Sequence, residues 1–358
     1  MTSKPNLVVC FRETPVDEKH IARIAAAWPG VNIINTDQKG IAQALFEADY
    51  FCGHAKVPVP WDEVVSQGRL RWVQSSAAGM DWLLTPSVIA SDITVTTASG
   101  VLADQVSEHG LALTLAWHRN LSAFILDQHA QTNNPDWRRF KRKPTRDLTE
   151  KNVGIVGFSG VGRRFSEVVR PFARRIVATD LYPENKPAHV DELWPAGRLD
   201  DLLAESDVVF LSLPLCQATR GIFDAARLAR MKKGALLVNM ARGPLVDSDA
   251  LARAIASEHL AGAVMDVTSP EPLPAGHPLW DFPQVLITPH VGGQIRWRFD
   301  DVCDIFCENV RRYLNGEPLI NRLSPEGKQL GFPLRNGETP LWIDLKSRYS
   351  TRGNHSAD

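Results

Sequence analysis

The sequence predicts an α/β protein with mostly parallel sheets, and three observations lead to this prediction. Short apolar runs alternate with segments of helical spacing along most of the chain. The stretch 152–180, NVGIVGFSGVGRRFSEVVRPFARRIVATD, reads as strand, glycine turn, helix, strand and acid. The chain has 358 residues, which is more than one ordinary domain needs. We therefore expect a doubly wound parallel sheet and a second, smaller α/β unit.

Composition and charge exclude several classes of protein. The formal net charge is -1 and 44% of the residues are hydrophobic, so neither nucleic acid nor a membrane is an expected partner. The first residues, MTSKPNLVVCF, hold too short an apolar run for a signal peptide, and no apolar stretch is long enough to span a membrane. Five cysteines do not make a disulfide framework in a chain of this length. We expect a soluble cytoplasmic protein.

The first hundred residues predict the smaller unit. Strands are expected at 7–11, 31–34, 48–52, 70–74 and 93–97, and helices at 17–28 and 41–46. The loop Ser75–Gly79 follows the fourth strand at its carboxyl end, where parallel sheets bind ligands. Its backbone amides could hold a carboxylate. A plain turn explains the same residues equally well.

The stretch 101–121 has the longest uninterrupted helical pattern, with apolar residues on more than one face. Such a helix is expected to be buried, between domains or between subunits. We interpret His109 and His118 within it as packing or hydrogen-bonded side chains rather than as ligands. The polar, basic stretch 131–147 is expected to be an exposed loop or arm.

The glycine-containing stretch organises the larger unit. Gly157, Gly160 and Gly162 form a turn between a strand and a helix, and Asp180 ends the next strand. This spacing is typical of dinucleotide-binding units, in which the helix N-terminus holds the pyrophosphate and the acid holds the adenosine ribose. Ser159 stands at the second glycine position of G-x-G-x-x-G, so the motif alone is a weak signal. A serine is tolerated there if its φ is negative.

Polar side chains recur where the later strands are expected to end. Strands are predicted at 207–213, 235–240, 263–267 and 285–288. Arg242, Asp266, Glu271 and His290 stand at or just beyond the carboxyl ends of these strands. Because those ends share one edge of a parallel sheet, we expect the four side chains to converge there. A random scatter of charge would seldom do this, and we interpret the four as a functional cluster.

The rest of the chain predicts a long helix and a polar tail. The helix is expected at 299–314, where Cys303 and Cys307 stand four residues apart. They could share a metal, but no nearby ligand completes a zinc set, so two core residues are the simpler interpretation. Residues 324–358 are polar, and Trp342 with Ile343 could pin part of this tail onto the body.

These segments resemble the D-isomer-specific 2-hydroxyacid dehydrogenases over nearly the whole chain, to about Asn321. The most specific segments are NMARGPLVD, MDVTSPEPL and TPH, in this order and spacing. The resemblance implies an NAD-binding Rossmann domain inserted into a smaller flavodoxin-like substrate domain, with the active site in the cleft. It implies a substrate-binding (catalytic) domain at 1–101 plus 292–323, an NAD-binding domain at 102–291 and a C-terminal extension at 324–358.

The resemblance also implies roles for individual residues. Arg242 would bind the substrate, Glu271 would partner the histidine, and His290 would be the catalytic acid/base. Ala78 and Gly79 would bind the substrate carboxylate through their amides. The expected cofactor is NAD, and the residues implied to bind it are Gly157, Ser159, Gly160, Val161, Gly162, Asp180, Ala241 and Asp266. Within this set, Asp266 would hold the nicotinamide carboxamide, and Asp180 would favour NAD over NADP. A homodimer through the helix at 101–121 and the arm at 131–147 is also implied.

The implied roles agree with the chemistry of 2-keto acid reduction, which adds a hydride to the carbonyl carbon and a proton to its oxygen. An imidazole titrates near neutrality and can supply that proton, and a neighbouring carboxylate favours its charged form. A guanidinium offers a planar fork to a carboxylate. We therefore expect an enzyme similar to glyoxylate or hydroxypyruvate reductases.

Two alternatives and several departures from the family pattern stay open. The same cluster does not exclude a phosphite- or formate-type dehydrogenase, and an NAD(H)-sensing, corepressor-like interaction protein is an alternative of another class. Thr268 stands where an aromatic residue is usual, and Ser269 stands where an acid is common. These two changes could alter the pocket wall. The basic-aromatic cluster Arg296–Arg298 has no assigned role.

Overall fold

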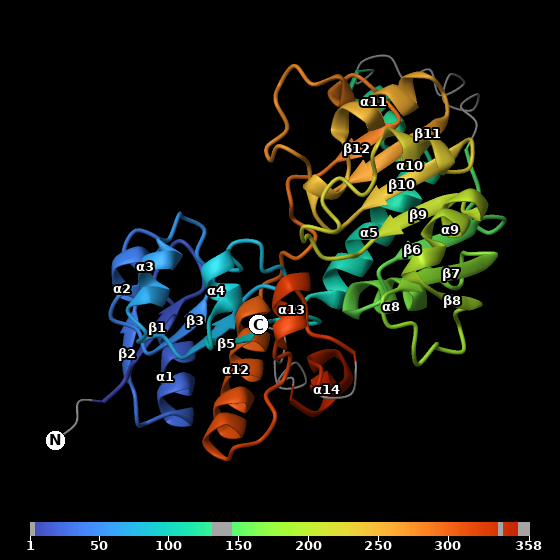
Figure 1. Cartoon of the computed structure of the whole chain (residues 1–358). Helices are drawn as coiled ribbons and strands as arrows, with labels where there is room; N and C mark the ends of the chain where they lie inside the picture. The colour runs from blue at the N-terminus through green and yellow to red at the C-terminus, as the bar shows by residue number, and fades with distance from the viewer. Residues whose placement is uncertain (1–3, 131–144, 336–338, 350–358) are drawn as a thin grey trace. The chain divides into compact units, whose positions relative to one another are not determined.

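The chain divides into two compact units in a computed structural model that describes residues 4–130, 145–335 and 339–349 (Figure 1). One unit combines residues 1–102 with 295–358, and the other comprises residues 103–294. Most of the arm expected at 131–147 lies outside the described residues. Within the described residues, no helix is both long enough and apolar enough to cross a membrane.

The first unit contains a five-stranded parallel sheet with the strand order β2-β1-β3-β4-β5. Its strands are β1 (Asn6–Cys10), β2 (Asn32–Asn35), β3 (Tyr50–Gly53), β4 (Trp72–Ser75) and β5 (Thr94–Thr96). Its helices are α1 (Glu18–Ala27), α2 (Ile41–Leu45), α3 (Trp61–Ser66), α4 (Pro86–Ala90), α12 (Arg298–Leu314), α13 (Pro325–Leu330) and α14 (Trp342–Tyr349). This is the flavodoxin-type order, and it confirms the predicted smaller α/β unit.

Alternate side chains of β1 enter opposite halves of the first unit's core. Leu7 and Val9 pack in a cluster with residues of α1 and α12, whereas Val8 and Cys10 pack with residues of α2, α3 and α4. The period of two along a strand requires this division, and the wholly apolar run LVVC suits a strand covered on both faces. Helices therefore cover both faces of this sheet.

The second unit contains a seven-stranded parallel sheet with the order β12-β11-β10-β9-β6-β7-β8. Its strands are β6 (Asn152–Val156), β7 (Arg175–Asp180), β8 (Glu192–Pro195), β9 (Val208–Leu211), β10 (Ala235–Asn239), β11 (Leu260–Met265) and β12 (Val285–Ile287). Its helices are α5 (Ala103–His118), α6 (Leu121–Ala130), α8 (Gly160–Val169), α9 (Leu199–Glu205), α10 (Ala225–Arg230) and α11 (Ser248–Ala256), with 3-10 turns η1 (Ala196–Arg198), η2 (Gly243–Leu245) and η3 (Pro278–Trp280). The order reverses beside β6, as in Rossmann folds, which confirms the predicted fold class.

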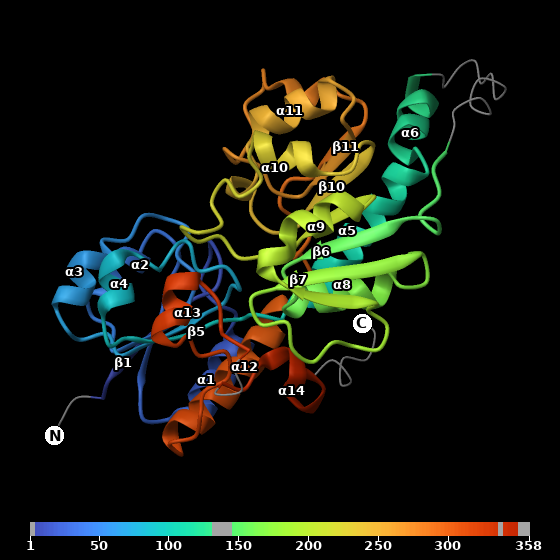
Figure 2. The same cartoon turned by 45° about the vertical axis from the view of Figure 1, so that its right-hand side comes forward.

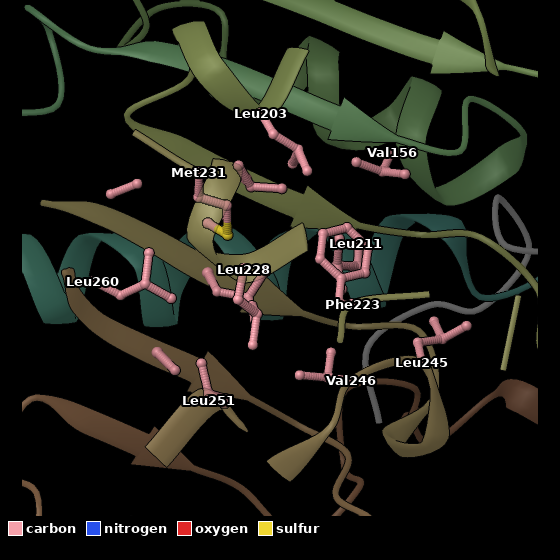
Figure 3. Packing of buried hydrophobic residues seen from close by; sticks show 14 of the residues in the cluster. Val156, Leu203, Leu211, Phe223, Leu228, Met231, Leu245, Val246, Leu251 and Leu260 are labelled. Atoms are coloured by element: carbon pink, nitrogen blue, oxygen red, sulfur yellow. The ribbon is translucent and has the colours of Figure 1, made fainter. Parts of the chain in front are cut away.

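Burial on both faces explains the apolar strands of the second unit. Along β9, Val209 and Leu211 join the cluster shown in Figure 3, which includes side chains from α9, α10 and α11. Val208 and Phe210 join the opposite cluster with residues of α5 and α8. Figure 2 shows α8 beside the paired strands β6 and β7. Because all seven strands are parallel, their carboxyl ends lie along one edge of the sheet.

The predicted helix at 101–121 is wrong in its extent. Helix α5 ends at His118, Asn120 has a φ of 54°, and α6 begins at Leu121. A residue in the left-handed region cannot continue a right-handed helix, so the chain turns at this position. The longest helix of the described chain is instead α12, with 17 residues against 16 in α5.

Part of the polar tail packs onto the first unit, as the sequence suggested for Trp342 and Ile343. Helices α13 and α14 belong to the first unit, and Trp342 at the start of α14 is 0% exposed. The Trp342 amide donates to Asn321 Oδ1 at 3.0 Å. A Cβ placed on Gly100 would lie 3.0 Å from Ile343 Cβ. One large buried indole thus joins a mainly polar segment to the core.

The two cysteines of α12 both pack in the first unit's core. Cys303 is fully buried, and partly buried Cys307 packs against the same cluster. Burial raises the pKa of the Cys307 thiol to about 11. Within the described residues, no group of three His, Cys, Asp or Glu side chains could hold a metal ion.

Candidate active site

The glycine turn after β6 is shaped by two close backbone approaches. Gly157 has a φ of 88°, and a Cβ there would lie 2.8 Å from the Leu213 amide nitrogen. A Cβ on Gly162 would lie 2.2 Å from the Gly157 carbonyl oxygen. Ser212 Oγ donates to the same carbonyl at 2.6 Å. Only glycine fits these two positions, and the turn brings α8 directly against the end of β6.

Ser159 is compatible with this turn. It is the N-cap of α8 with a φ of -88°, which any L-residue adopts without strain. The first turn of α8 contains Gly160, Val161 and Gly162, whose amides point out of the helix start as in any helix. Such an N-terminus suits a pyrophosphate, so these residues fit the dinucleotide expected from the sequence.

Asp180, at the end of β7, already supports the glycine turn. Its Oδ2 accepts from the Phe158 amide at 2.6 Å, and its Oδ1 accepts from the Tyr182 amide at 2.9 Å. A carboxylate offers about four acceptor positions. The two that remain match a vicinal diol such as that of a ribose.

The loop after β10 presents Arg242. Asn239, the last residue of the strand, is completely buried, and it bonds the Ala241 amide at 3.1 Å and the Arg242 carbonyl at 3.0 Å. The half-buried Arg242 side chain donates to the Ala241 carbonyl. A Cβ on Gly243 would lie 1.7 Å from the Thr268 carbonyl oxygen. The loops after β10 and β11 therefore lie directly against each other.

Glu271 is held in the loop after β11. The hydroxyl of Thr268 donates to the Pro270 carbonyl at 2.8 Å, and the Thr268 amide lies 3.4 Å from Glu271 Oε2. Thr268 itself is 5% exposed. The residue that replaces the family's usual aromatic side chain thus braces the loop that carries the glutamate.

His290 and Glu271 form a direct pair. His290 Nδ1 lies 2.7 Å from Glu271 Oε1, and the two side chains are 46% and 43% exposed. An ionised carboxylate only accepts, so Nδ1 carries a proton and Nε2 is left for other chemistry. His290 has a φ of 54°, an uncommon conformation for a non-glycine residue that is typical of functional sites.

Asp266 anchors the loop that carries His290. Its Oδ1 accepts from Thr288 Oγ1 at 2.6 Å and from the Val291 amide at 2.9 Å, and its Oδ2 accepts from the Gly292 amide at 2.8 Å. Its backbone carbonyl accepts from the His290 amide at 2.8 Å. Three of about four acceptor positions on the carboxylate are filled. One position on Oδ2 remains, which fits the single contact expected with a carboxamide.

The loop expected to bind a carboxylate belongs to the first unit. Ser75 Oγ bonds the Ala77 amide at 3.0 Å and turns the chain after β4. The amides of the next residues, exposed Ala78 and half-buried Gly79, donate to no acceptor within the described chain. Ser76 is 1% exposed, and its hydroxyl has no partner among the described residues. Unsatisfied donors of this kind suit an anion.

Within the second unit, the predicted polar residues do gather at one edge of the sheet. Glu271 bonds His290, Asp266 bonds the His290 loop, and the Arg242 loop packs against the Glu271 loop. Sequence reasoning missed two supporting residues, the buried Asn239 and the partly buried Thr288. Each is a lone polar residue at the end of an apolar run, in LLVN at 236–239 and in LIT at 286–288. This pattern could have identified both residues.

Several known proteins are similar to this chain over most of its length. A family model described as "D-isomer specific 2-hydroxyacid dehydrogenase, NAD binding domain" matches residues 111–292. A glyoxylate reductase from Thermofilum pendens is 32% identical over 257 residues, which are 71% of this chain and 75% of that protein. A D-3-phosphoglycerate dehydrogenase from Mycobacterium tuberculosis is 31% identical over 310 residues, which are 86% of this chain. The chain spans only 56% of the length of that relative.

A solved structure shares the fold over most of this chain. It is a D-isomer specific 2-hydroxyacid dehydrogenase from Xanthobacter autotrophicus Py2 in complex with NADPH and MES, with a TM-score of 0.73 and 27% identity. The match covers 90% of this chain and 99% of that one. The chain therefore belongs to the D-isomer-specific 2-hydroxyacid dehydrogenases, a family of NAD-dependent enzymes that act on CH–OH groups.

Proposed function

We propose that this chain reduces a small 2-keto acid, such as glyoxylate or hydroxypyruvate, to the 2-hydroxy acid with NADH. The observation that carries the proposal is the His290–Glu271 pair, with its nitrogen–oxygen distance of 2.7 Å and its exposed side chains. A substrate must be able to reach the acid/base pair that acts on it, and both side chains of this pair are exposed to solvent.

In this proposal, His290 supplies the proton and the bound nicotinamide supplies the hydride. The proton of Nδ1 is engaged by Glu271, so Nε2 is the atom that protonates the developing alkoxide. Glu271 fixes the orientation of the ring through this hydrogen bond. General acid catalysis of this kind typically contributes about 10²- to 10⁴-fold in rate.

Arg242 is proposed to bind the substrate. A guanidinium can bridge a carboxylate and a carbonyl oxygen, and its positive charge stabilises the alkoxide that forms. Asn239 supports the loop that carries it. We propose that the substrate carboxylate binds the unsatisfied amides of Ala78 and Gly79, as the family resemblance implies.

We propose NAD rather than NADP as the preferred coenzyme. The two free acceptor positions of Asp180 suit the two hydroxyls of an adenosine ribose, whereas a 2′-phosphate would meet like charge. Asp180→Ala would remove that repulsion, and we expect the preference for NADH over NADPH to fall in initial-rate assays. An unchanged preference would contradict this role for Asp180.

We also propose that the chain forms a homodimer through α5 and α6. On α6, the apolar side chains of Leu121, Ile125 and Leu126 are 47%, 52% and 68% exposed. Three such residues on one short helix suggest a surface that is covered in an assembly. Sedimentation equilibrium would test this proposal, and a monomer at micromolar concentration would contradict it.

The decisive test of the proposed reaction is the loss of NADH absorbance with a panel of 2-keto acids. The panel should include glyoxylate, hydroxypyruvate, pyruvate and a phosphorylated hydroxypyruvate. We expect saturable turnover of at least one of them. Formate and phosphite are tested in the opposite direction, by the reduction of NAD. Turnover of only formate or phosphite, or of nothing despite NADH binding, would overturn the proposal.

A further inference from the structure

We propose that His109 is a positioning residue that holds the His290 loop through Thr288 and Asp266. This inference rests on the proposed function, because it assigns a support for the same catalytic histidine. His109 lies on α5, far from His290 in the sequence, and its Nε2 lies 3.0 Å from Thr288 Oγ1. The same nitrogen lies 3.4 Å from Asp266 Oδ1.

The direction of this hydrogen-bond chain follows from counting protons. Thr288 has one hydroxyl hydrogen, and its 2.6 Å contact with Asp266 Oδ1 uses it, because an ionised carboxylate can only accept. The Thr288 oxygen must then accept from His109, so His109 Nε2 carries a hydrogen. The order is His109 to Thr288 to Asp266, and each group fixes the next.

Asp266 connects this chain of hydrogen bonds to the loop that carries His290. Its two carboxylate oxygens accept the amides of Val291 and Gly292, the two residues after His290. A hydroxyl and two amides hold the carboxylate in one rotation. If the carboxylate turned, both amides would lose their acceptor, and His290 would lose the backbone support for its φ of 54°.

The packing around Gly292 shows how little room the loop has. A Cβ at this position would lie 2.8 Å from Asp266 Oδ2 and 3.2 Å from His109 Cδ2. The backbone after His290 bonds to the aspartate, and any side chain at this position would crowd both Asp266 and His109. The His109 side chain is 23% exposed, so most of it is covered by the surrounding residues.

The test compares His109→Leu with His109→Gln. Leucine removes the donor, whereas the glutamine amide nitrogen can donate from nearly the same place. For His109→Leu we expect amide hydrogen exchange in 288–292 to accelerate about tenfold and kcat to fall about 10- to 100-fold, as for a catalytic group moved by a fraction of an ångström. The KM for the keto acid should change much less than kcat. His109→Gln should recover most of both losses.

A matched control exists in the same unit. His189 Nε2 lies 2.9 Å from Ser166 Oγ, which donates its own hydrogen to the Arg163 carbonyl at 2.6 Å. The arrangement repeats that of His109 and Thr288 away from the His290 loop. His189→Leu should change neither the exchange of 288–292 nor kcat.

The two readouts separate failure of this inference from failure of the proposed function. If the unmodified chain turns over no 2-keto acid, the proposed function fails, and the exchange measurement still decides whether His109 holds the loop. Unchanged exchange in His109→Leu would overturn the inference. Equal losses in His109→Gln and His109→Leu would also overturn it, because donation from Nε2 would then not be the cause.

Discussion

Two histidine–carboxylate pairs, one in each unit, show how burial separates a structural contact from a reactive one. In the first unit, His20 Nε2 lies 3.1 Å from Asp300 Oδ1, and in the second, His290 Nδ1 lies 2.7 Å from Glu271 Oε1. The contacts are similar, but the His20 side chain is 3% exposed and the His290 side chain is 46% exposed. Only the second pair can meet a substrate.

The surroundings of the two pairs differ as well. Asp300 also accepts from Lys19 at 3.0 Å, and the buried pair joins α1 to α12. Burial lowers the pKa of His20 despite its carboxylate partner. Burial opposes ionisation of Asp300, but hydrogen bonds from Lys19 and His20 bring its pKa below the usual value. Pairing alone therefore does not make a histidine catalytic, and access and loop geometry must accompany it.

The largest expected effect is at the exposed pair. His290→Gln removes the titrating group, and we expect kcat for 2-keto acid reduction to fall about 10²- to 10⁴-fold. The thermal midpoint should hardly move, because the side chain is exposed. Steady-state kinetics and thermal unfolding on the same preparation check both expectations. A large fall in the thermal midpoint together with the loss of kcat would show that His290, like His20, supports the fold. That result would contradict the distinction between the two pairs.

The second effect concerns the partner of His290. Glu271→Gln keeps the shape but removes the negative charge beside His290 Nδ1, and we expect kcat to fall roughly 10- to 100-fold, at the weaker end of acid/base effects. Steady-state kinetics measure this loss, and a kcat of Glu271→Gln equal to that of the original chain would show that the carboxylate does not support the histidine.

A smaller effect, on stability alone, is expected at the buried pair. His20→Leu breaks the contact with Asp300, and we expect the free energy of unfolding to fall by about 1–2 kcal/mol. The kcat should stay within about twofold, because His20 lies in the first unit's core and the acid/base pair lies in the second unit. Urea unfolding and initial rates measure the two quantities. A large loss of kcat would contradict the structural role.

The smallest effect is the pH dependence that His20 gives to stability. Its folded pKa is lowered, so its contribution is complete above the ordinary value of 6.5 and is lost as the pH falls below it. Asp300 also has a lowered pKa, and its contribution is lost as the pH falls below 3.8. In His20→Gln, the first decline should disappear and the second should remain. Unfolding curves between pH 8 and pH 3 (about the limits set by these groups) decide the matter.

The sequence predicted the architecture and the edge of the sheet well, and it predicted the supports of the site poorly. Apolar runs located the strands that precede Arg242, Asp266 and His290 because burial on both faces of a sheet leaves a strong local pattern. The contact of His109 with Thr288 joins segments that are 179 residues apart, so it depends on which distant segments meet. The φ of His290 and the burial of Trp342 likewise arise from tertiary contacts that no local pattern contains.

The short elements were missed for a related reason. Helices α3 and α4, with six and five residues, and β8, with four, were not among the predicted elements, although α2 and β2 of similar length were. Their stability comes from packing rather than from propensity. Trp61 of α3 and Val88 of α4, for example, are buried in the first unit's core.

The most direct test of the central claim follows deuterium from the coenzyme. The chain is incubated with a 2-keto acid and NADH deuterated at C4 of the nicotinamide, and the product is analysed by mass spectrometry and chiral chromatography. We expect one deuterium on C2 of a D-2-hydroxy acid, formed much more slowly by His290→Gln. A product without deuterium at C2, or equal rates in the two proteins, would contradict hydride transfer assisted by the His290–Glu271 pair.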